Sequence, residues 1–93
     1  MLTTNLSLYI SSLKELRAEI AESDSEDYVI NKINLIDYNL VMYDQVRHAE
    51  CLSLITKFHI AIMELRNSGK LEKLPFLILL DDYIAKLPGL LPE

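Results

Sequence analysis

The chain has 93 residues, of which 51% are hydrophobic and 25% are charged, and its formal net charge is −5. This length is typical of one domain, and the composition is that of a globular chain rather than a disordered one. The acidic balance argues against nucleic acid as a partner, because binding to phosphates needs a basic face.

The first predicted helix covers residues 5–22. Its apolar residues recur every three or four positions, which places them on one face of a helix: Leu6, Ile10, Leu13, Leu16 and Ile20.

A second helix is expected to begin near residues 25–27. Ser23 and Glu26 have the spacing of a capping box, and Asp24 or Ser25 can cap a helix equally well. Acidic side chains at a helix start also complement the positive end of the helix dipole.

Residues 28–67 contain neither glycine nor proline, and they carry two apolar stripes. The first is Val29, Ile33, Ile36, Leu40 and Tyr43; the second is Cys51, Leu54, Ile55, Phe58, Ile62 and Leu65. Three residues of the first stripe each have a counterpart eighteen residues later in the second stripe: Ile33 and Cys51, Ile36 and Leu54, and Leu40 and Phe58. Eighteen residues are five turns of a straight helix, so the two stripes could lie on the same face of one helix. One continuous helix of roughly 60 Å is therefore allowed, and it would need a second copy to cover it.

The polar interval 44–50 favours a break between the two stripes. We therefore prefer two helices, about 26–44 and 47–67, over the single long one. Gly69 is positioned to end the second of these helices in a left-handed conformation.

Pro75 suits the first turn of a last helix, roughly 75–86, which is apolar nearly all round. Together these segments predict an all-α fold in one domain, residues 1–93. Its architecture is a small antiparallel helical bundle of three long helices and a shorter apolar C-terminal helix.

A single cysteine, Cys51, cannot form an internal disulfide, so nothing indicates a secreted disulfide scaffold. The first basic residue is Lys14, so the N-terminus lacks the charged region of a signal peptide. The longest apolar run, 76–80, is too short to span a bilayer. We expect a cytoplasmic protein that does not act on membranes.

The stretch 47–59 holds both histidines and the only cysteine, but it does not predict a catalytic or metal site. His48-Ala49-Glu50 resembles the His-x-Glu of zinc-dependent deaminases, yet the Pro-Cys-x-x-Cys that completes that zinc shell is missing. His59 lies about 16 Å along a helix from His48, too far to share a metal ion. We expect no enzyme, no cofactor and no bound metal.

The first functional hypothesis is an acidic module that binds another protein, such as a basic toxin or nuclease. Immunity proteins against bacterial toxins are similar in size and charge balance, which is an analogy of class only. The predicted partner-binding residues are Glu19, Glu22, Asp24, Glu26, Asp27, Tyr28 and Tyr38.

The alternative is a homo-oligomeric scaffold, regulator or chaperone, with a homodimer as its simplest form. It would assemble through the apolar C-terminal segment, with an interface formed by Phe76, Leu77, Leu80, Leu87, Leu90 and Leu91. A metal or redox protein centred on residues 48–59 is the third and weakest hypothesis.

Overall fold

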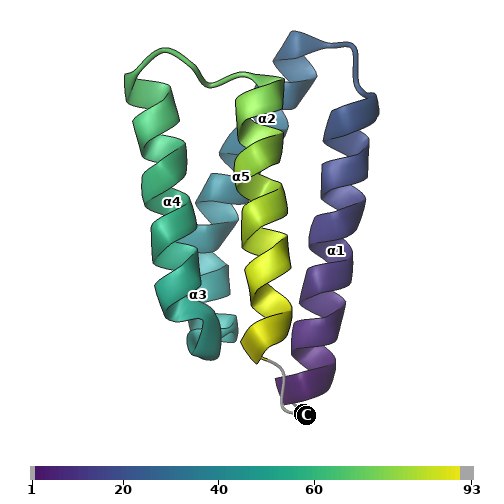
Figure 1. The fold of residues 1–93 in the computed structure, drawn as a ribbon, viewed down its shortest axis with the longest axis vertical. Coiled ribbons are helices and arrows are strands. Elements are labelled where there is room, and N and C mark those ends of the chain that lie inside the picture. The colour runs from purple at the N-terminus through teal and green to yellow at the C-terminus, as the bar shows by residue number, and fades with distance from the viewer. Residues whose placement is uncertain (1, 91–93) are drawn as a thin grey trace.

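Four main helices run antiparallel to one another in the computed structural model, which describes the backbone of residues 2–90 and the side chains of residues 6–90 (Figure 1). In chain order the elements are α1 (Leu2–Glu22), α2 (Glu26–Asn39), the π-helical turn η1 (Leu40–Asp44), α3 (Gln45–Arg47), the 3-10 turn η2 (Ala49–Cys51), α4 (Leu52–Asn67), α5 (Lys73–Lys86) and the 3-10 turn η3 (Leu87–Leu90). No strand occurs between residues 2 and 90. The predicted all-α antiparallel bundle is confirmed.

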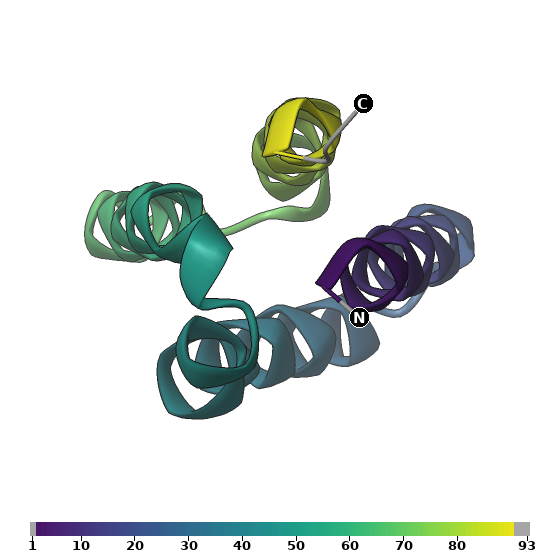
Figure 2. The same cartoon turned by 90° about the horizontal axis from the view of Figure 1, so that it is seen from below.

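Viewed along its length, the bundle has one helix at each corner (Figure 2). Helix α5 packs mainly against α1 and α4, and the α2–η1–α3 segment closes the remaining side. The molecule measures 38 × 25 × 20 Å.

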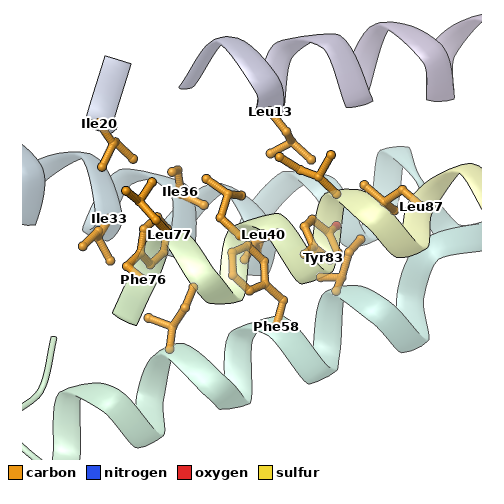
Figure 3. Close-up of a cluster of buried hydrophobic side chains, with 14 of the residues drawn as sticks. Leu13, Ile20, Ile33, Ile36, Leu40, Phe58, Phe76, Leu77, Tyr83 and Leu87 are labelled. Carbon is orange, nitrogen blue, oxygen red and sulfur yellow. The ribbon is translucent and has the colours of Figure 1, made fainter. Parts of the chain in front are cut away.

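The predicted apolar stripes form the core between these helices (Figure 3). Leu13 of α1, Ile33 of α2 and Phe58 of α4 are buried and converge on α5, where Phe76 and Leu80 are fully covered. Burying one large apolar side chain of this kind stabilises the folded state by about 1.5–3 kcal/mol.

The chain breaks between the two central stripes, as predicted, and the break falls at His48. Its backbone angles, φ −127° and ψ 57°, are not helical. The single long helix over residues 26–67 is therefore not formed.

The end of the α2 stripe differs from the prediction, because η1 is a π-helical turn. A π turn accommodates one more residue than an α turn, so it shifts the helix face that the following residues occupy. Tyr43, expected in the core, is exposed. The side chain of Asp44 takes the inward position instead and contacts α1.

Gly69 ends α4 in the predicted left-handed conformation, with φ 74°. Lys70 N donates to Leu65 O at 2.9 Å, and Gly69 N donates to Arg66 O at 3.2 Å. These two bonds satisfy carbonyl groups that the helix end would otherwise leave free.

Candidate functional site

The turn between α1 and α2 is fixed by two serines. Ser25 caps α2: its Oγ accepts a hydrogen bond from Tyr28 N at 3.2 Å, and its carbonyl accepts one from Val29 N at 3.1 Å. Ser25 N in turn donates to Ser23 Oγ at 3.2 Å. Of the caps that the sequence allowed, the fold uses Ser25.

Every residue of the predicted partner-binding set is exposed. Glu26 and Asp27 occupy the first turn of α2, where they complement the positive end of its dipole. We call the four carboxylates around this turn the acidic end: Glu22, Asp24, Glu26 and Asp27.

The surface is hollowed on both sides of this turn. One hollow, of about 490 Å³, brings Glu19 and Glu22 of α1 together with Tyr28 of α2. The other, of about 450 Å³, extends from Asp24 and Glu26 to the start of α5, where it is lined by Glu72, Lys73 and Leu74. Six of the seven predicted residues therefore gather around one end of the bundle; Asp27, in the first turn of α2, is the one of these six that lines neither hollow.

Two lysines lie near this end, and both have partners within the chain. Lys32 Nζ lies 3.5 Å from Glu19 Oε2 and 5.4 Å from the centre of the Tyr28 ring. Lys73 Nζ donates to Ser23 O at 2.7 Å. Neither lysine pairs with a carboxylate of the acidic end.

Tyr38 does not belong to this site. It lies ten residues beyond Tyr28 along α2, and its ring packs edge to face on that of Tyr43, with centroids 5.9 Å apart. Both rings lie on the second half of the α2–η1–α3 segment, away from the α1–α2 turn.

Most residues of the predicted oligomer interface lie in the interior of the bundle and not on its surface. Four of its six side chains are buried in the core of the single chain: Phe76, Leu77, Leu80 and Leu87. They face α1, α2 and α4, so they cannot also line a surface between two chains unless the bundle opens. Leu90 is exposed, and Leu91 lies outside the described residues.

Sequence reasoning missed a polar cluster inside the opposite end of the bundle. Tyr9 of α1 donates its hydroxyl hydrogen to Asp44 Oδ2 at 2.9 Å, and its oxygen lies 2.8 Å from the hydroxyl of Tyr83 in α5. An ionised carboxylate only accepts, so the single hydrogen of Tyr9 is used on Asp44. Tyr83 must therefore donate to Tyr9, which gives one directed chain from α5 through α1 to η1.

Aromatic rings surround this cluster. His48 stacks on Tyr9 with centroids 4.2 Å apart, and Phe58 stacks on Tyr83 at 4.5 Å. The only sequence signal for this site is Asp44 itself, which directly follows the apolar stripe. Its partners lie 35 and 39 residues away and give no local pattern.

Burial shifts the proton affinities of these groups. Burial raises the pKa of the Asp44 carboxyl above its ordinary 3.8, although the Tyr9 hydroxyl and the charges of His48 and Arg47 oppose the shift. Burial also raises the pKa values of the Tyr9 and Tyr83 hydroxyls above 10.0. It raises the pKa of the Cys51 thiol to about 11, which leaves this thiol protonated and unreactive at neutral pH.

The residues of the 47–59 stretch serve the packing of the bundle. Cys51 is buried, and His59 of α4 contacts Asp37 of α2, which Arg66 also approaches. Within the described chain, no group of three or more histidine, cysteine, aspartate or glutamate side chains is arranged to hold a metal ion.

The chain matches no protein-family model, no curated protein and no solved structure. Between residues 2 and 90, no helix is both long enough and apolar enough to cross a bilayer.

Proposed function

We propose that the protein is a small acidic binding module whose α1–α2 end docks on a basic surface of another protein. One observation carries this proposal. The four carboxylates of the acidic end are exposed, and they enter none of the ion pairs formed among residues 6–90.

Three aspartates elsewhere in the protein already have cationic or histidine partners within the chain. Asp81 pairs with Arg17, Asp82 pairs with Lys86, and Asp37 contacts His59 and Arg66. Carboxylates without an internal cation can meet the lysines and arginines of a partner without first breaking a contact. Such complementarity mainly accelerates association and selects the partner.

Tyr28 adds an apolar contact beside these charges. It is exposed in the hollow that Glu19 and Glu22 line. Tyrosine is enriched among the residues that dominate binding energy, because it combines a large ring with a polar tip. The size and charge of the protein favour one form of this function. In this form, the protein is an inhibitor or immunity-type protein that neutralises a basic toxin or nuclease in the cytoplasm.

The test compares two variants with the same change in net charge. In the first, Glu22→Gln, Asp24→Asn and Asp27→Asn remove three charges from the acidic end. In the second, Glu15→Gln, Glu50→Gln and Glu64→Gln remove three exposed charges elsewhere. Each tagged protein is used to capture partners from the native host, and the captured proteins are identified by mass spectrometry.

We expect a basic protein to be retained by the wild type and by the second variant, and to be lost by the first. The affinity for the purified partner should fall steeply as salt is added. Equal binding by both variants, or an affinity that does not respond to salt, would contradict the proposal.

A further inference from the structure

The outward face of the α2–η1–α3 segment carries a stripe of exposed apolar side chains, which we call the outer stripe: Leu35, Tyr38, Met42 and Val46. They are between 48 and 76% exposed. Their spacings of three, four and four residues place them on one helix face, away from the buried Ile33, Ile36 and Leu40. The second half of this segment is therefore apolar on both its inner and its outer side.

No charged side chain belongs to the outer stripe. Between Lys32 and Arg47 the only charged residues are Asp37 and Asp44. Asp37 is only 14% exposed in its side chain and contacts His59 and Arg66 of α4, whereas Asp44 accepts the hydrogen bond of Tyr9. The stripe itself is therefore uncharged over about 16 Å, while the exposed Arg47 flanks its Val46 end and Arg66 of α4 reaches Asn34 and Asp37 beside it.

The stripe is also self-complementary. Read in either direction, it has an aliphatic side chain at each end and two larger side chains, Tyr38 and Met42, in the middle. A two-fold axis between these two positions would place Tyr38 of one copy on Met42 of the other. It would place Leu35 of one copy beside Gln45 and Val46 of the other. Aromatic residues and methionine in an uncharged centre are typical of interfaces between protein subunits.

We propose that the outer stripe is the interface of a homodimer, in which the α2–η1–α3 segments of two copies pack antiparallel across a two-fold axis. The antiparallel direction follows from charge. Antiparallel packing places the two acidic ends at opposite ends of the dimer. Parallel packing would bring the two acidic ends close together, where their negative charges would repel each other. A basic partner has no free carboxylate to meet on the stripe, because Asp37 and Asp44 already have partners within the chain.

This dimer is independent of the proposed docking at the acidic end. Because the acidic ends lie away from the outer stripe, both stay accessible in the dimer. Each dimer would then present two docking sites, one at each end.

The first test is the oligomeric state, measured by sedimentation at micromolar concentrations. We expect the wild type to be a dimer and Met42→Lys to dissociate about a hundredfold more readily, because each dimer would bury two unpaired ammonium groups. Ile78→Lys is the matched control, since Ile78 of α5 is equally apolar and 70% exposed. A monomeric wild type, or dissociation by Ile78→Lys but not by Met42→Lys, would overturn the proposal.

A second measurement tests the register and does not depend on the stability of a lysine variant. Chains with Tyr38→Cys are mixed with chains with Met42→Cys and oxidised gently. Mixed disulfide dimers should form faster than either symmetric pair, and much faster than dimers of Ile78→Cys. The buried Cys51 thiol competes little, because its pKa is raised to about 11. Equal rates for all pairs, or binding of a monomeric wild type to neutral phosphatidylcholine vesicles through the stripe, would reject the dimer.

Discussion

The two ends of the α2–η1–α3 segment are built by different means. At its start, the α1–α2 turn is held mainly by local hydrogen bonds between Ser23, Ser25 and the first turn of α2, with one long-range bond from Lys73 Nζ to Ser23 O. At its end, Asp44 is held by Tyr9, 35 residues earlier, and through Tyr9 by Tyr83. The turn can therefore change its surface chemistry without disturbing the core, whereas the far end is part of the core itself.

The largest loss of stability should come from disrupting the aromatic packing near the Asp44 end of the segment. Phe58 is buried between Tyr83, at 4.5 Å, and Phe76, at 6.0 Å. We expect Phe58→Ala to lower the free energy of unfolding by about 3–5 kcal/mol, because it leaves a cavity. Urea unfolding followed by circular dichroism measures this loss. The exposed neighbour variant Lys57→Ala should stay within about 0.5 kcal/mol of the wild type, and equal losses would remove the contrast.

The hydrogen-bond chain should contribute the next largest effect. Tyr9→Phe removes the acceptor of Tyr83 and the donor to Asp44, both partly or fully buried, and we expect a loss of about 1–3 kcal/mol. The matched variant at the other end, Tyr28→Phe, removes an exposed hydroxyl and should change little. If both variants unfold at the same urea concentration, the chain of hydrogen bonds does not stabilise the fold.

At the start of the segment, the cap of Ser25 should matter less. Ser25→Ala removes the acceptor for Tyr28 N, and we expect a loss of about 1 kcal/mol in the free energy of unfolding. Ser53→Ala, at an exposed helical position of α4, is the control and should not destabilise the protein. A thermal melt of both variants measures the difference, and a Ser25→Ala variant as stable as its control would show that the cap is dispensable.

The smallest expected effect is a dependence on pH. Burial raises the pKa of Asp44 above 3.8, so the folded protein holds this proton more tightly than the unfolded chain does. The stability contributed by this group is complete below its unfolded pKa and is lost as the pH rises through the folded pKa. Because the site is partly solvated, we expect this pH-dependent change in the free energy of unfolding to be no more than about 1 kcal/mol.

Asp44→Asn should remove that decline, since an amide does not titrate and its oxygen can still accept from Tyr9. Asp27→Asn at the acidic end should leave the decline in place. Urea midpoints between mildly acidic and neutral pH measure both profiles, and a decline that persists in Asp44→Asn would assign it to another group.

Much of the bundle could be predicted because its causes are local. The spacing of Leu13, Ile33 and Phe58 on their helices indicated the core, and Gly69 indicated the end of α4. The exposed acidic residues follow equally directly from their positions around a solvated turn. What could not be predicted depends on tertiary contacts.

The apolar C-terminal helix shows this limit most clearly. Its residues Phe76, Leu77 and Leu80 indicated either deep packing or a partner surface, and only the positions of the other three helices decide between the two. Tyr38 shows the same limit, since sequence alone could not separate it from Tyr28. The cluster of Tyr9, Asp44 and Tyr83 combines residues from three elements that share no sequence pattern.

The π turn at Leu40–Asp44 makes the positions of the later side chains depend on the number of residues in this turn. A π turn holds one residue more than the α-helical turn that it replaces. Deleting a single residue between Leu40 and Asp44 would restore the α-helical repeat and rotate every later position of the segment. Asp44 would then leave its place beside Tyr9, and Val46 would leave the outer stripe. A change of one residue in the length of this turn is therefore enough to remove the internal polar cluster and to shorten the outer stripe.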